Sequence, residues 1–146
     1  MLAKSPALRG IRGAITVSKN SRKEILEGTR ILLKKVLQEN KIHIENIVSV
    51  IFSTTRDLNA EFPAVAARQI GMDFTPLLCT HEMNVPQGLK KCIRILLHVN
   101  TNKSQRAMKN VYLRGAEALR PDLPERSLGL FYVTDKKSTK KGKRKR

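Results

Sequence analysis

Arg94 is the first candidate functional residue, because it is a charged residue in the middle of a largely apolar segment, Lys90–Thr101. An unpaired charge in such surroundings is costly, so the guanidinium must meet a partner, a ligand or solvent. Glu82 lies just past the preceding predicted strand and is the natural internal partner, although it could instead accept a hydrogen bond from a bound hydroxyl group. Arg94 is therefore either half of a structural salt bridge or a ligand-binding residue, and both alternatives stay open.

The other ligand-type side chains form no recognised metal site or nucleophilic pair. Cys79, His81, Glu82 and His98 match no common zinc-binding spacing. Cys79 and His81 would share one face of a strand, but no third group that would orient a Cys–His pair is evident. Cys79 is equally well explained as a small core residue. The glycines fit neither a phosphate loop nor a dinucleotide motif, which argues against a nucleotide cofactor.

Most of the remaining candidate functional residues are arginines. Four of them lie near the ends or faces of predicted elements and could converge on a small polyanion: Arg12, Arg68, Arg94 and Arg120. Because no nucleophile or base accompanies them, such a site would bind and polarise its ligand.

The elements that position these residues follow from the spacing of apolar side chains. Ser21 with Glu24 is a capping-box signature, and the apolar stripe after it has a helical period that ends near Asn40. A shorter helix is predicted between Pro63 and Gly71, a proline suited to a first turn and a glycine suited to a C-terminal cap. Five strands are predicted, at Leu8–Val17, Ile47–Phe52, Thr75–Thr80, Lys90–Thr101 and Val111–Leu113.

Strand and helix interpretations compete for the segment that contains Arg94. In strand register one face is purely aliphatic, whereas the other carries Cys92, Arg94, Leu96 and His98. This alternation favours a strand. The order strand, helix, strand, helix, strand, strand, strand predicts one α+β (mixed α/β) domain with a mixed sheet, whose regular part closes at Arg120–Pro124.

The net charge of +17 suggests anionic partners, but much of it is concentrated at one end. Lys136–Arg146 carries eight of the 29 basic residues and none of the 12 acidic ones. Such a run is typical of a solvated, flexible segment, and nucleic acid is a candidate partner only through it, because the few aromatic residues are not interleaved with basic runs. We predict a domain over residues 1–126 and a flexible basic tail over 127–146.

Two cysteines, Cys79 and Cys92, are too few for a disulfide framework and too far apart for a CxxC motif. No apolar stretch is long enough for a signal peptide or a membrane span. We expect reduced thiols in a soluble, cytoplasmic protein.

Four colinear blocks resemble the trimeric, monofunctional (AroH-type) chorismate mutases. They run from Leu8 to Leu123 and read LRGIRGAITV, STTRDLNAEFPAVAAR, PLLCTHEMNVPQGLKKCIRILLHVNT and VYLRGAEALRPDL. The resemblance implies a five-stranded mixed sheet with two main helices on one face, assembled as a homotrimeric pseudo-barrel with active sites between subunits. It also implies the Claisen rearrangement of chorismate to prephenate, in phenylalanine and tyrosine biosynthesis. That isomerisation needs no nucleophile, metal or cofactor, which fits the missing catalytic dyad.

The resemblance assigns the central roles to three charged residues. Arg94 would donate to the ether oxygen on which negative charge develops. Glu82 would accept from the ring hydroxyl, with Cys79 hydrogen-bonding nearby. Arg12 and Tyr112 would hold a substrate carboxylate and so fix the reactive conformer.

The resemblance also implies an apolar wall, formed by Phe62 and Leu119, and a basic cleft mouth, formed by Arg68 and Arg120. The chain departs from the family pattern at Val65, Leu78, His81 and Gln87. Val65 replaces a frequent lysine, which would weaken substrate attraction without touching the chemistry. Two other functions stay open: a nucleic-acid-binding module that uses the tail, and a related trimeric fold with another small-molecule chemistry such as imine hydrolysis.

Overall fold

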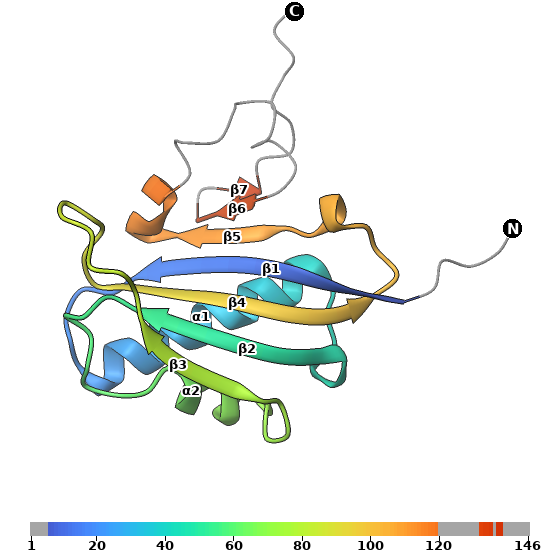
Figure 1. Cartoon of the computed structure of the whole chain (residues 1–146), viewed down its shortest axis with the longest axis horizontal. Helices are drawn as coiled ribbons and strands as arrows, with labels where there is room; N and C mark the ends of the chain where they lie inside the picture. Colours follow the sequence, from blue (N-terminus) through green and yellow to red (C-terminus); the bar gives the residue numbers. More distant parts are fainter. Residues whose placement is uncertain (1–5, 120–131, 136, 139–146) are drawn as a thin grey trace, which may run out of the picture.

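A computed structural model describes residues 6–119, 132–135 and 137–138, and its centre is one mixed β-sheet (Figure 1). The described part of the sheet has seven strands in the order β3-β2-β4-β1-β5-β6-β7. β4 is antiparallel to both of its neighbours, whereas β1 and β5, and β2 and β3, run parallel. The strands are β1 (Ala7–Thr16), β2 (Ile47–Thr54), β3 (Leu77–His81), β4 (Cys92–Thr101), β5 (Asn110–Leu113), β6 (Tyr132–Thr134) and β7 (Lys137–Ser138).

The mixed α+β class is confirmed, but the prediction of five strands is wrong. The first five strands correspond to the five predicted segments, and β6 and β7 extend the sheet beyond β5. The prediction that regular structure closes at Arg120–Pro124 is wrong for the same reason. β6 lies within the segment predicted to be a tail, yet Val133 is 1% exposed and belongs to the main core. The sheet therefore continues beyond residue 126, the predicted domain boundary.

Helix α1 (Arg22–Asn40) begins and ends where its sequence signals place it. The Ser21 hydroxyl accepts a hydrogen bond from the Glu24 backbone N–H at 3.2 Å, as a capping residue should. Lys41 closes the helix in the left-handed conformation. Helix α2 (Ala64–Gln69) follows Pro63 directly, and Gly71 after it has a φ of 108°, which favours glycine. Three short 3₁₀ helices complete the fold: η1 (Ile44–Asn46), η2 (Gln105–Ala107) and η3 (Arg114–Leu119).

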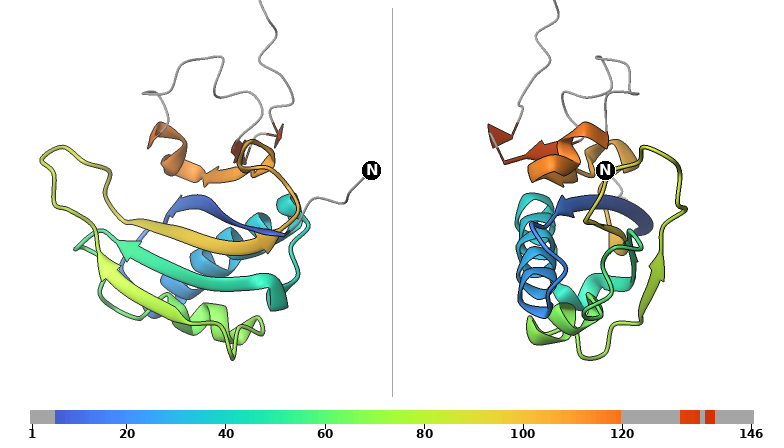
Figure 2. Two further views of the ribbon diagram at one scale, coloured as in Figure 1. Left: turned by 45° about the vertical axis from the view of Figure 1, so that its right-hand side comes forward. Right: turned by 90° about the vertical axis from the view of Figure 1, so that its left-hand side faces the viewer.

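The main core lies between the two helices and one face of the sheet (Figure 2). The apolar stripe of α1 packs on the aliphatic face of β1 and β4, and all of these side chains are buried: Ile25, Leu32, Leu33, Val36, Ile11, Ile15, Ile93 and Leu97. Gly28 of α1 allows a close approach to β1, because a Cβ there would lie 2.6 Å from Cγ1 of Val17. Both helices thus cover one face, as predicted.

The opposite face of the sheet carries the polar alternates of the strands. Along β4 the fully buried residues alternate with the half-buried Arg94 and His98 and with the exposed Leu96. This alternation confirms the predicted strand register. Leu8 and Leu78 are also exposed apolar residues, at 55% and 61%. No helix among the described residues is long and apolar enough to cross a membrane.

Candidate functional site

The register of the sheet brings residues from five strands into one row on the face away from the helices. Ala14 of β1 pairs with Tyr112 of β5 on one side and with Arg94 of β4 on the other. Arg94 in turn pairs with Ser53 of β2, which pairs with Thr80 of β3. Small side chains at positions 14 and 53 therefore flank the arginine. Because they leave space over the sheet, the guanidinium can lie on the surface between them.

Arg94 and Glu82 are brought together, as the sequence suggests. Nε of Arg94 lies 3.6 Å from Oε2 of Glu82, and the two side chains are 27% and 32% exposed. Glu82 follows β3 directly, where its backbone N–H donates to the Thr54 carbonyl at 2.8 Å. Nε of Arg94 is buried and makes no hydrogen bond within the described residues. The ion pair therefore orients the guanidinium while leaving it hydrogen-bonding capacity.

A cavity of about 160 Å³ lies over this row. It is lined by five of the predicted site residues, Arg12, Glu82, Arg94, Tyr112 and Leu119. Leu119 is carried there by η3, whose start is fixed by a hydrogen bond of 2.9 Å from the Gly115 N–H to the Thr16 hydroxyl. Arg12 is exposed at the rim, and its own backbone N–H donates to Oδ1 of Asn110 at 2.9 Å. Two arginines against one glutamate make this cavity suited to an anion.

Ala14 and Tyr112, which line the cavity, belong to a small and tightly buried cluster. Ala14, Cys92, Tyr112 and Ala116 form a small cluster in which none of the four is more than 1% exposed. Burial raises the pKa of the Cys92 thiol to about 11, against the opposing effect of the nearby Arg94 charge. Cys92 is accordingly a neutral thiol at physiological pH. A buried, low-dielectric cluster beside the cavity strengthens the field of the nearby guanidinium.

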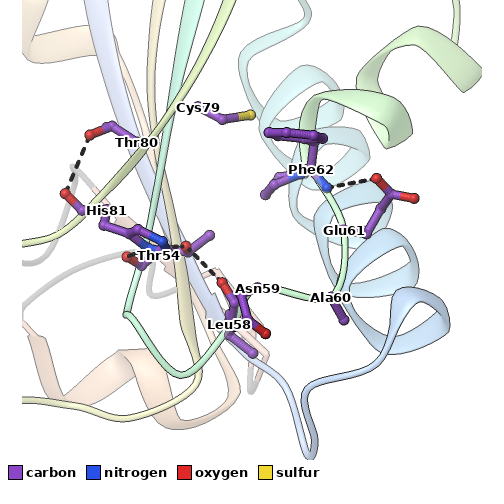
Figure 3. A pocket seen from close by; sticks show the side chains of 10 residues that line it. Thr54, Leu58, Asn59, Ala60, Glu61, Phe62, Cys79, Thr80 and His81 are labelled. Atoms are coloured by element: carbon purple, nitrogen blue, oxygen red, sulfur yellow. Dashed lines mark hydrogen bonds between the residues drawn. The ribbon is translucent and has the colours of Figure 1, made fainter.

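Phe62 and Cys79 line a different cavity, of about 430 Å³, shown in Figure 3. Cys79 pairs with the buried Phe52 of β2, so its side chain lies on the helix-covered face, opposite to Arg94. Burial raises the pKa of the Cys79 thiol, although a backbone hydrogen bond from Ala64 and the positive charge of Arg68 oppose the shift. Within one chain, Cys79 and Glu82 therefore line separate cavities, and the role predicted for Cys79 beside Glu82 stays a prediction.

The two cavities divide the candidate residues into two groups. Phe62 is 68% exposed at the second cavity, and Arg68 lies in the last turn of α2, near Cys79. Arg120 lies outside the described residues. The single chain thus assembles the charged group around Arg94 and, separately, a second group that contains Phe62, Cys79 and Arg68.

Sequence reasoning missed several lining residues of the Arg94 cavity. Ala14, Ile51, Ser53 and Leu96 also line it. Ser53 was detectable in principle, since it is a small polar residue in an apolar strand. The histidines take structural partners instead: Nδ1 of His81 lies 3.2 Å from the Thr54 hydroxyl, and Nδ1 of His98 lies 3.0 Å from the Ser49 hydroxyl. Among the described residues, no group of three or more His, Cys, Asp or Glu side chains could hold a metal ion.

Comparisons with known proteins converge on one family. The family profile described as chorismate mutase type I matches residues 8–123. The chain is 45% identical over 117 residues to chorismate mutase AroH of Bacillus subtilis (strain 168), with 80% of this chain and 92% of that protein covered. It is 50% identical over 117 residues to chorismate mutase AroH of Thermus thermophilus, with 80% and 96% covered. Among solved structures, a chorismate mutase from Clostridium thermocellum matches with a TM-score of 0.74 and 48% identity, over 75% of this chain and 97% of that one.

Proposed function

Because the chain belongs to the chorismate mutase type I family, it is an isomerase that converts chorismate to prephenate in aromatic amino-acid biosynthesis, and we propose that Arg94 supplies its main catalytic charge. The rearrangement breaks one C–O bond and forms one C–C bond within a single molecule. Negative charge develops on the ether oxygen as the C–O bond breaks. The observation that supports the proposal is the placement of Arg94 in a cavity beside a buried cluster, with Oε2 of Glu82 3.6 Å from its Nε.

In this mechanism the guanidinium of Arg94 donates to the ether oxygen in the transition state. A preorganised donor of this kind typically contributes on the order of 3 to 4 kcal/mol, equivalent to a rate effect of roughly 10² to 10³, and a full charge contributes more. No proton moves in the reaction. The rate should therefore be nearly flat from about pH 6 to 9.

Arg12 and Tyr112 bind a substrate carboxylate, and the Glu82 carboxylate accepts a hydrogen bond from the ring hydroxyl of the substrate. The support is their position, because all three line the cavity that contains Arg94. Holding both ends of the substrate fixes the compact conformer in which the new C–C bond can form. Leu119 closes the apolar side of the same cavity.

The complete site is formed by two subunits of a homotrimer. Phe62 and Cys79 line a cavity separate from that of Arg94 in their own chain, and in the trimer they serve the Arg94 cavity of a neighbouring subunit. Exposed apolar side chains on the strands and beside the second cavity favour such an assembly: Leu8, Phe62, Leu78 and Leu96. Arg68, and Arg120 outside the described residues, attract the dianionic substrate through their positive charge. The free thiols of Cys79 and Cys92 are compatible with the reducing cytoplasm, where we place the enzyme.

The role of Arg94 is tested by following the loss of chorismate absorbance with the purified Arg94→Ala variant. We expect kcat/KM to fall by at least about 10³-fold while circular dichroism stays unchanged. Arg106→Ala is the matched control, because Arg106 is an exposed arginine of η2 that does not line the Arg94 cavity. Near-normal activity of Arg94→Ala would reject the proposed role.

Shared sites are tested by mixing two inactive variants. Arg94→Ala and Phe62→Asp damage different halves of the proposed site, so each is expected to be inactive alone. If subunits are exchanged at random in an equal mixture, about one site in four receives two intact halves. Recovery of about a quarter of the normal activity is expected after co-expression. No recovery in demonstrably mixed oligomers would show that one chain holds the complete site.

A further inference from the structure

The loop from Met83 to Lys91 lies between the two members of the central ion pair, and a segment that begins at the last residue of β2 contacts the chain at both of its ends. At the first end, the Glu82 N–H donates to the Thr54 carbonyl at 2.8 Å. At the second end, the Cys92 N–H donates to the Thr55 hydroxyl at 3.0 Å, and the Thr55 N–H donates to the Cys92 carbonyl at 3.0 Å. The relative position of Glu82 and Arg94 therefore depends on four consecutive residues, Thr54 to Asp57.

Asp57 is the central acceptor in this segment. Its Oδ2 and Oδ1 accept from the Lys91 backbone N–H at 2.9 and 3.2 Å. Its Oδ1 also accepts from the Thr55 hydroxyl at 2.5 Å. Because the Thr55 hydroxyl donates to Asp57, it presents a lone pair to the Cys92 N–H. One carboxylate thus orders both backbone N–H groups at the start of β4.

Lys91 shows why such a clamp is needed. Its φ is 48°, in the left-handed region that is unfavourable for a residue with a side chain. Backbone in this region persists only when surrounding contacts hold it. Asp57 holds the Lys91 N–H, and the Lys91 ammonium donates to the Ser18 carbonyl at 3.2 Å. Arg94 follows three residues later, on the same strand face as Cys92.

We propose that Asp57 is a positioning residue for the rearrangement, which acts through Lys91 and Thr55 to fix the start of β4 and thereby the guanidinium of Arg94. Asp57 lines a cavity of about 680 Å³ together with Glu82 and Arg94, and both of its carboxylate oxygens accept hydrogen bonds from the chain itself. Its effect is therefore exerted on the geometry of Arg94. Since Arg94 acts in the transition state, loss of Asp57 lowers kcat and kcat/KM together and leaves KM nearly unchanged.

The test compares Asp57→Ala with Asp57→Asn and with the double variant Asp57→Ala/Lys91→Gly. Asp57→Ala should lower kcat by about 10- to 100-fold, with KM within about twofold of wild type. Asp57→Asn keeps one acceptor oxygen and should be intermediate. Glycine adopts a φ of 48° without strain, so Lys91→Gly should restore part of the lost kcat. Hydrogen exchange of residues 83–92, followed by mass spectrometry, should be faster in Asp57→Ala.

Gln105→Ala is the control, because it also removes a hydrogen bond between a side chain and the backbone, but at a site away from Arg94. It removes the bond of 2.7 Å from Nε2 of Gln105 to the Gly10 carbonyl, outside the cavities that contain Arg94, and should leave kcat unchanged. Wild-type kcat in Asp57→Ala, or a rise in KM alone, would overturn the proposal. If Asp57→Ala does not fold, Asp57→Asn serves instead: the proposal would be overturned if that variant had the wild-type kcat and the wild-type rate of hydrogen exchange.

The inference rests on the role proposed for Arg94, so Arg94→Ala is measured in parallel. Full activity of Arg94→Ala would reject that proposed role. An inactive Arg94→Ala beside a fully active Asp57→Ala would reject only the positioning by Asp57.

Discussion

Nε of Arg94 lies 3.6 Å from Oε2 of Glu82, close enough for attraction and too far for a hydrogen bond. A fully hydrogen-bonded buried pair would be a structural element, whose donors are used up within the chain. This looser pair has its two charges at the edge of one cavity, together with Arg12 and Tyr112. The geometry therefore favours ligand binding among the two alternatives that the sequence leaves open for Arg94.

Glu82→Gln should lower kcat/KM by about 10- to 100-fold. The change removes a charged acceptor that orients Arg94 and binds the substrate hydroxyl, and hydrogen bonds to charged groups contribute about 1.5 to 3 kcal/mol. Steady-state kinetics by chorismate absorbance measure the loss. Glu45→Gln, at an exposed carboxylate of η1, is the control. Equal activity of the two variants would exclude Glu82 from the site.

Ala14→Leu should raise KM and lower kcat/KM by about tenfold or more. Ala14 is 1% exposed and lies between Arg94 and Tyr112 in the same row, so a larger side chain would fill part of a cavity of about 160 Å³. Overpacking would also cost about 1 to 3 kcal/mol of stability. Ala107→Leu, at an exposed position of η2, controls for added apolar volume. Unchanged kinetics in Ala14→Leu would mean that the substrate does not occupy this cavity.

Local periodicity predicted much of the fold, because α1 and β4 each carry a clear pattern. The Ser21 cap, the end of α1 at Asn40 and the alternation along β4 are properties of neighbouring residues, and the structure has them where predicted. β6 and β7 were missed because strands of three and two residues contain too few alternations to be recognised. β3 begins at Leu77, two residues after the predicted start at Thr75, because Pro76 has no backbone N–H to donate to the sheet.

The site shows the same limit. Alternation indicated correctly that Cys92 and Arg94 share a face, as residues two apart on one strand must. The position of Cys79 relative to Arg94 depends on the pairing of β3 with β2 and of β2 with β4, which are contacts between distant segments. Leu119 reaches the cavity through η3, a short helix without a distinctive periodicity. Long-range register and 3₁₀ geometry are therefore the parts that required the structure.

Stability should fall as the pH rises from about 9 to 11, in part through Cys92. Burial raises the pKa of its thiol from 9.0 to about 11. In this window the unfolded chain has lost the proton and the folded chain keeps it, so the unfolded state is favoured as pH rises. The full effect is about 2 to 3 kcal/mol. The effect is measured by urea unfolding of wild type and Cys92→Ala at pH 8 to 11. The difference in free energy of unfolding between the two proteins should become smaller as the pH rises. A difference that stays constant would contradict the burial argument.

Gly28→Ala should destabilise the fold by up to about 2 kcal/mol, although the same change in an exposed helix would stabilise it. The helical gain of alanine over glycine is about 1 kcal/mol. The new Cβ opposes this gain, because it would lie 2.6 Å from Cγ1 of the buried Val17. Overpacking of this kind typically costs about 1 to 3 kcal/mol. The double variant Gly28→Ala/Val17→Ala removes the clash and should recover part of the loss. Urea unfolding at neutral pH decides the matter, since a stabilised Gly28→Ala would show that α1 can shift away from β1 at little cost.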